Sequence, residues 1–274
     1  MHFTKEGITI MKESDHPNTG KIKKVIIFIA LLVASSYFFG TVCHRVSSIG
    51  DGIFAFNTGN LRLFIELFVS IGILVITAGL VAVLLRPFWT CVVAFALSSL
   101  TIFLAWQFSI ASTVAVVLYF LVGLLYCRGV SRGLEERIKF SSRAISEHQT
   151  ILFLILLVAI TASFYLGYSK QFDQRGFSTP SFVTQIAVRI QNPEPSTKAE
   201  FIAKFDEQVK DLIEPYGRFV PIAMSFTFFV ALDFVVFILG WIPVLLLRLI
   251  LYILIHLQVI KVRTEIREVQ RLTI

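Results

Sequence analysis

Two ionisable residues lie deep inside the last apolar stretch of the chain, residues 219–260. Asp233 and Arg248 are equally far in sequence from Gly240-Trp241, where a tight turn is expected. A hairpin folded there would bring both charges to one depth, about seven residues or roughly 11 Å from the turn. We therefore expect an intramembrane ion pair that either fixes the register of the hairpin or moves protons or ions. The alternatives are snorkelling to an interface and separate partners for the two residues.

Glu66 is the other carboxylate inside an apolar stretch, near the start of residues 63–85. We expect an interfacial carboxylate that reaches water; pairing with Arg45 or Arg62 is an alternative. A cation site would need a second carboxylate three or four residues away, and none is there. The five histidines and three cysteines have no metal-ligand spacing, so we expect no metal and no cofactor.

Enzyme motifs are incomplete or missing in this sequence. There is no nucleophile elbow, zinc-protease helix motif or phosphate-binding glycine loop. Residues 51–56 resemble the start of the CDP-alcohol phosphotransferase signature, but Phe56 replaces its arginine and the downstream aspartates are missing. Residues 135–137 resemble the paired glutamates of CAAX-type proteases, but Phe140 stands where that motif has arginine. We therefore expect a protein that is not an enzyme.

The composition indicates that membrane helices hold these residues. Of 274 residues, 56% are hydrophobic and only 16% charged, and the mean hydropathy is +0.79. A soluble surface needs more charge than this. The net charge is +7, but the basic residues lie beside apolar stretches, as membrane orientation requires. The expected partner is therefore the lipid bilayer and not nucleic acid.

The apolar stretches predict an all-α integral membrane protein. The stretch 88–127 is twice as long as a helix needs to cross roughly 30 Å of hydrocarbon, so we divide it near Trp106-Gln107. With residues 219–260 folded as a hairpin, the chain is a polytopic bundle of about seven transmembrane helices. The five earlier spans are 25–40, 63–85, 88–105, 109–127 and 150–168.

The same pattern divides the chain into segments. A cytoplasmic polar tail precedes a five-helix region, which contains a basic cytoplasmic loop; an extracytoplasmic segment, the C-terminal hairpin and a charged tail follow. In that order, the segments are 1–24, 25–168, 128–149, 169–218, 219–260 and 261–274.

The insertion 169–218 contains the extramembrane structure that the sequence predicts. Residues 182–190 have the composition of an extended segment. Thr197 and Glu200 form a capping-box pattern, and an amphipathic helix of about 198–214 is expected after it.

Ala159, Ser163 and Gly167 form a stripe of small residues at four-residue spacing in the span 150–168. Such stripes let helix backbones approach closely. We expect the stripe to pack within the chain; a homo-oligomer interface is the alternative.

The distribution of basic residues predicts the orientation. With seven spans and the N-terminus inside, the short inside segments hold eleven Lys and Arg and the outside segments hold six. If 243–258 lay in the interface, there would be six spans, and the tail 261–274 would be inside. Both counts place the N-terminus inside, in what we expect to be the cell membrane.

We expect a non-enzymatic accessory or scaffold subunit of a membrane complex, which binds another protein through 169–218 or 128–149. The alternative is a small transporter or channel that uses Asp233 and Arg248 as pathway residues.

Overall fold

The part of the chain that the structure describes folds into helices connected by short links. This computed structural model describes residues 19–49, 58–85, 88–106, 108–135, 143–175, 179, 181–191 and 197–257. The elements are α1 (Thr19–Ile49), α2 (Thr58–Leu84), α3 (Phe88–Ala105), α4 (Ile110–Glu135), α5 (Arg143–Arg175), α6 (Ser181–Gln191), α7 (Lys198–Ile213), the 3-10 helix η2 (Glu214–Phe219), α8 (Val220–Leu239) and α9 (Trp241–His256).

Among the residues that the structure describes, six helical segments are long and apolar enough to cross a membrane. They include α1 to α5, and the sixth ends with α8, while α9 is a shorter apolar helix. The predicted all-α polytopic membrane fold is confirmed. The break predicted near Trp106-Gln107 falls where α3 gives way to α4.

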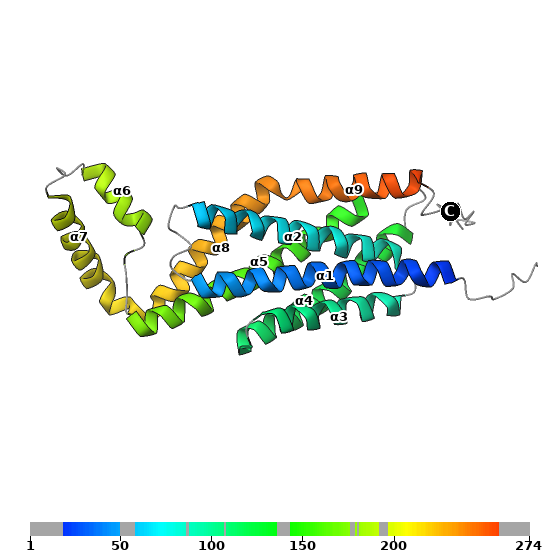
Figure 1. Cartoon of the computed structure of the whole chain (residues 1–274), viewed down its shortest axis with the longest axis horizontal. Coiled ribbons are helices and arrows are strands. Elements are labelled where there is room, and N and C mark those ends of the chain that lie inside the picture. The colour runs from blue at the N-terminus through cyan, green and yellow to red at the C-terminus, as the bar shows by residue number, and fades with distance from the viewer. Residues whose placement is uncertain are drawn as a thin grey trace, which may run out of the picture.

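The molecule consists of a helix bundle and an arm that projects from one end of it (Figure 1). The helices α1 to α5 and α9 run lengthwise in the bundle, and α5 and α8 extend past the ends of α1 and α2. Beyond them, α6 and α7 form the arm. The segment predicted to lie outside the membrane is therefore the part of the chain that stands clear of the bundle.

Packed side chains fill the centre of the bundle. Lipid is as apolar as these side chains, so close packing and not water exclusion drives helix association in a membrane. Gly40 allows α1 to approach Ala105 on α3, and Gly123 leaves room for the Phe95 ring. The fully buried side chains include Leu32, Phe39, Leu67, Leu74, Phe95, Ile102, Tyr119 and Phe164.

The chain bends at Gly240 and does not reverse there, so the predicted hairpin of residues 219–260 is wrong. Gly240 has right-handed helical angles (φ −63°, ψ −18°), and its N–H donates to the Val236 carbonyl at 2.6 Å. Pro243 has no N–H for the carbonyl four residues before it, which bends a helix without ending it. The helix α9 therefore continues away from α8 (Figure 1).

The helix α9 lies along α2 and ends where α1 begins (Figure 1). Two glycines of α2 make room for it: a Cβ at Gly72 would lie 3.6 Å from Pro243 Cγ, and one at Gly79 only 2.6 Å from Leu247 Cδ2. Together, α8 and α9 thus make one bent crossing of the bundle. They do not fold back as a hairpin, and α9 does not lie flat along an interface. Within the described residues, the chain therefore crosses the bundle six times, and the shorter apolar helix α9 completes the sixth crossing.

Residues 182–190, predicted to be extended, belong to the helix α6. The β-branched residues that suggested a strand form part of an amphipathic helix, whose apolar side faces α7. Pairing of the two amphipathic helices outweighs the local preference of these residues for extended backbone. Thr197 stands at the N-cap position of α7, but its side chain makes no capping hydrogen bond.

Candidate partner-binding surfaces

Asp233 and Arg248 both lie on the outward surface of the bent α8–α9 crossing, and their side chains are exposed. On α8, the side that packs inward carries Phe228 and Leu232, and Asp233 lies outside it. On α9, Leu247 is buried against Gly79 of α2, and Arg248 points away from that contact.

The structure does not bring Asp233 and Arg248 together, so the predicted ion pair is absent. Fifteen residues of a bent helix separate the two side chains by roughly 20 Å, at 1.5 Å per residue. Within the described residues, neither side chain has a hydrogen-bond or ion-pair partner. The prediction depended on the hairpin, and the bend at Gly240 removes its geometric basis.

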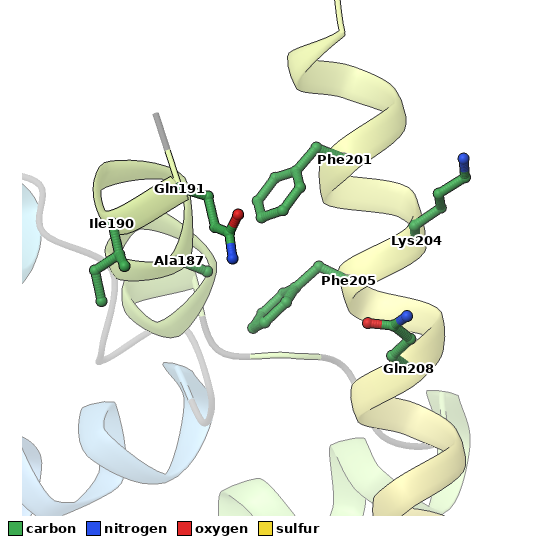
Figure 2. A pocket seen from close by; sticks show the side chains of 7 residues that line it. All are labelled: Ala187, Ile190, Gln191, Phe201, Lys204, Phe205 and Gln208. Atoms are coloured by element: carbon green, nitrogen blue, oxygen red, sulfur yellow. The ribbon is translucent and has the colours of Figure 1, made fainter. Parts of the chain in front are cut away.

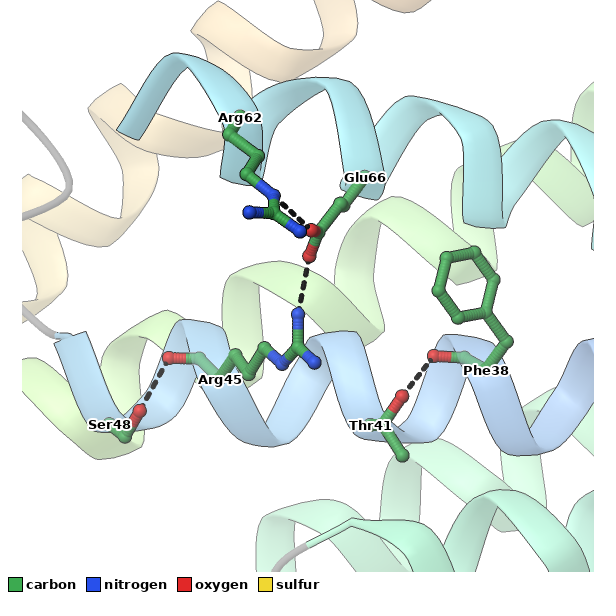
Figure 3. Close-up of polar contacts among 6 residues, drawn as sticks. All are labelled: Phe38, Thr41, Arg45, Ser48, Arg62 and Glu66. Atoms are coloured by element: carbon green, nitrogen blue, oxygen red, sulfur yellow. Dashed lines mark hydrogen bonds and ion pairs between the residues drawn. The ribbon is translucent and has the colours of Figure 1, made fainter. Parts of the chain in front are cut away.

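Glu66 binds two arginines at the end of the bundle where α1 ends and α2 begins (Figure 3). Arg45 Nη1 donates to Glu66 Oε2 at 2.5 Å across the helix pair, and Arg62 Nε donates to Oε1 at 3.0 Å along α2. The exposed fractions are 57% for the Arg45 side chain, 82% for Arg62 and 21% for Glu66. The carboxylate is therefore partly covered, and both guanidinium groups are open to solvent.

A groove of about 490 Å³ runs between α6 and α7 in the arm. Phe201 and Phe205 of α7 point toward α6, and Gln191 extends toward Phe201 (Figure 2). The two rings stack with their centroids 6.1 Å apart. Lys204 donates to Glu200 at 2.7 Å on the outer side of α7, and this contact lowers the pKa of the Glu200 carboxyl.

The arm is held together weakly. Thr184 of α6 donates to Asp206 of α7 at 3.5 Å, and no residue of α7 is fully buried. Ile190 and Leu212 are 77% and 75% exposed. The arm thus presents apolar side chains on small helices that have little packing of their own.

The small-residue stripe of α5 lies against α1. A Cβ on Gly167 would overlap the backbone oxygen of Ser47, so the two helix backbones lie in close contact there. Ser163 and Ala159 are buried one and two turns further along α5. Ser163 donates to the Ala159 carbonyl at 3.0 Å, so its hydroxyl is satisfied within its own helix.

Buried hydroxyl groups join four helices inside the bundle, and sequence reasoning missed them. The Ser98 hydroxyl bonds Ser36 on α1 at 2.5 Å and Tyr119 on α4 at 2.9 Å. Ser35 and Thr77 pair at 2.8 Å between α1 and α2. The available signal was the Ser-Ser pair inside each of two apolar stretches, 35–36 and 98–99.

The remaining reactive groups do not form a site in the described part of the chain. Cys43, Cys91 and Cys127 are buried free thiols. No group of three or more His, Cys, Asp or Glu side chains is gathered in a way that could hold a metal ion there. Most of the basic loop 128–149 lies outside the residues whose side chains are described.

Comparisons with protein-family models, with curated proteins and with solved structures gave no match. The function therefore has to be inferred from the geometry of the chain itself. Two features of that geometry are unusual for a membrane bundle: charges on its outward surface, and a small amphipathic arm beyond one end.

Proposed function

We propose that the chain is a non-enzymatic subunit of a membrane complex, and that the outward face of α8–α9 binds a transmembrane helix of a different protein. The observation that carries the proposal is the exposure of Asp233 and Arg248 on apolar helices. Charged residues in transmembrane segments almost always face a protein interior or a water-filled cavity. A bundle with two such charged residues on its outward surface is consistent with a subunit that has been separated from a neighbouring protein.

The energies favour a partner over bare lipid. Each charge costs about 2.5–3.5 kcal/mol at the centre of a membrane helix on insertion scales. Phe234 and Phe237 flank Asp233 and are 64% and 85% exposed, so an apolar surface surrounds the charge. A partner helix with a basic residue at the depth of Asp233 and an acidic residue at the depth of Arg248 would offset both costs.

A second copy of the chain fits this face less well. A symmetric oligomer in a membrane has its axis along the bilayer normal, so each residue faces its neighbour's residues of the same depth. Asp233 would then face Asp233, because Arg248 lies roughly 20 Å further along the crossing. Like charges at one depth disfavour that arrangement.

The arm supplies a second contact for the same partner. Its groove between α6 and α7 is apolar at the base, where Phe201 and Phe205 lie. Because α7 leads through η2 directly into α8, a protein bound to the arm is close to the α8 face. The proposal thus assigns the insertion 169–218 to partner binding.

We propose that the N-terminus lies on the cytoplasmic side of the cell membrane. The six-crossing path puts the end of α9 beside the start of α1 (Figure 1), and residues 261–274 carry four Lys and Arg. Assigning that tail to the inside leaves Arg45 and Arg62 as the basic residues of the short outside segments. This count satisfies the positive-inside rule better than seven spans do.

A transport role through Asp233 and Arg248 has less support. Pathway residues face the bundle interior or an aqueous cavity, whereas these two side chains face outward. The bundle centre is packed by large side chains in the described residues.

The test is site-specific photo-crosslinking in the native membrane. A photoreactive amino acid replaces Phe237 on the proposed face; the control replaces Leu125 on α4, which is 65% exposed. We expect one protein adduct of defined mass from position 237 and none from position 125. Asp233→Asn should remove the adduct, and an acidic residue in the identified partner should restore it for Asp233→Arg.

Two results would overturn the proposal. One is labelling of lipid alone at both positions. The other is an adduct with a second copy of this chain that persists in Asp233→Asn.

A further inference from the structure

The Arg45–Glu66–Arg62 cluster has more hydrogen-bond donors than its carboxylate uses. Arg45 uses Nη1 and Arg62 uses Nε to bind Glu66. Within the described residues, Nε and Nη2 of Arg45 and both Nη atoms of Arg62 have no acceptor. Each guanidinium is a rigid fork of five N–H donors that stays charged in proteins. The cluster therefore offers several oriented, unused N–H groups.

The cluster also has excess positive charge. Two guanidinium groups and one carboxylate leave a net charge of +1. The guanidinium groups reach the carboxylate from different helices, Arg62 from α2 and Arg45 from α1 (Figure 3). Glu66 thus holds the two cations close together, although their mutual repulsion would separate them.

The position of the cluster coincides with the edge of the apolar zone. Cys43 and Val46 of α1 and Leu63 and Leu67 of α2 are buried beside it. At the same level along the two helices, the surface of the bundle becomes polar, because Arg45 and Arg62 are exposed there. Phospholipid phosphates lie at such a boundary between hydrocarbon and water.

We propose that Arg45 and Arg62 together bind the phosphate group of an anionic phospholipid, with Glu66 as the spacer that holds them in place. Guanidinium forks bind phosphate oxygens in pairs, and such charge-assisted bonds are the strong ones. The ligand's chemistry is a phosphate monoester or diester with net negative charge. A free phosphate ion has the same chemistry, and the test separates the two sources.

This site is independent of the proposed partner face. It lies on α1 and α2, whereas Asp233 and Arg248 lie on α8 and α9. Failure of one proposal therefore leaves the other standing.

The test uses the full-length chain in phosphatidylcholine nanodiscs that contain phosphatidylglycerol, with retained lipids counted by native mass spectrometry. We expect preferential retention of phosphatidylglycerol. Arg45→Gln and Arg62→Gln should each reduce that preference about tenfold, the effect of losing one charge-assisted pair. The matched control is Arg218→Gln, an exposed arginine in η2 outside the cluster, which should leave the preference unchanged.

Glu66→Gln distinguishes a lipid-binding site from an ion-pair cluster that only holds α1 and α2 together. The amide oxygen still accepts an N–H from one arginine, while the net charge rises from +1 to +2. Because a neutral amide no longer holds the two cations together against their mutual repulsion, retention of phosphatidylglycerol should decrease although the net charge of the cluster is higher. If the cluster only holds the two helices together, all three cluster variants would have lower thermal stability and an unchanged lipid preference.

Competition with inorganic phosphate identifies the source of the ligand. If a lipid is bound, millimolar phosphate leaves the retained phosphatidylglycerol in place, because the acyl chains add to the affinity. Displacement by phosphate would assign the site to the free ion. Equal retention of both lipids by the native chain, without phosphate protection against unfolding, would overturn the proposal.

Discussion

Polar side chains in this bundle lie in two kinds of place. Hydroxyl groups such as Ser36, Ser98 and Tyr119 face inward and bond one another, which satisfies them without water. The formal charges Asp233 and Arg248 face outward. A hydroxyl needs only one partner and little space, so a helix interface can hold it, whereas a charge needs several donors or acceptors.

Tyr119→Phe removes one interhelical hydrogen bond and keeps the ring. Ser98 retains its bond to Ser36, so no hydroxyl is left without a partner. We expect a loss of about 0.6 kcal/mol, the average for such bonds in a membrane protein. Thermal unfolding in detergent would show it as a lower midpoint. Tyr165→Phe on the outward side of α5, where 37% of the residue is exposed, should leave the midpoint unchanged.

Asp233→Asn tests whether Asp233 is an outward-facing charge or one member of a buried ion pair. Removing one member of a buried ion pair costs about 3–5 kcal/mol, because the other charge is left uncompensated. Here the isolated chain should be as stable as the native one or more so, since an exposed charge on an apolar helix is neutralised. Thermal unfolding of both purified chains in detergent measures this. A strong destabilisation would contradict the outward placement.

Glycines set how closely the helices approach one another. Gly167 brings α5 onto α1, Gly40 brings α1 onto α3, and Gly79 seats α9 on α2. Because lipid competes equally for apolar side chains, contact between backbones and fit of shape decide which helices associate. The bend at Gly240 acts at the same scale, since it lets one helical segment pack on α5 and the next on α2.

Gly167→Ala should be among the most damaging single substitutions. The new Cβ would overlap the Ser47 backbone oxygen, and backbone cannot move aside as the end of a side chain can. We expect a loss of at least 1–3 kcal/mol, the usual range for overpacking. Abundance in the membrane and the unfolding midpoint both report it. Gly217→Ala is the control, because the nearest atom to its Cβ would be 3.7 Å away.

At the scale of the whole molecule, α1 begins and α9 ends at the same end of the bundle (Figure 1). Six crossings return the chain to the side on which α1 begins, whereas seven would leave it opposite (Figure 1). The arm projects from the opposite end of the bundle. Partner binding by the arm and by the α8–α9 face would thus engage one membrane protein both outside and inside the bilayer.

Single cysteines introduced before α1 and after α9 should both report the same side of the membrane. With six crossings, single cysteines at both positions react alike with a membrane-impermeant reagent, in intact cells and after permeabilisation. A cysteine introduced at Ser169, beyond the last turn of the apolar part of α5, should give the opposite response. Opposite responses of the two ends would restore the seven-span arrangement and its hairpin.

The sequence by itself determined the fold class, because apolar length and charge position depend only on composition along the chain. It located the break between α3 and α4 and a helix near 198–214, observed at Lys198–Ile213. It also identified Glu66 as a carboxylate at the edge of the apolar zone, with Arg45 and Arg62 as alternative partners. Both arginines proved to be its partners at once.

Only the tertiary structure decided between a reversal and a bend at Gly240. Gly240 and Pro243 permit either outcome, and the contacts of α9 with Gly72 and Gly79 on α2 favour the bend. That choice separates Asp233 from Arg248 and turns both outward. Side-chain partners across helices, including the Ser36–Ser98–Tyr119 bonds, likewise depend on rotations of whole helices, which apolar stretches without a clear polar face leave undetermined.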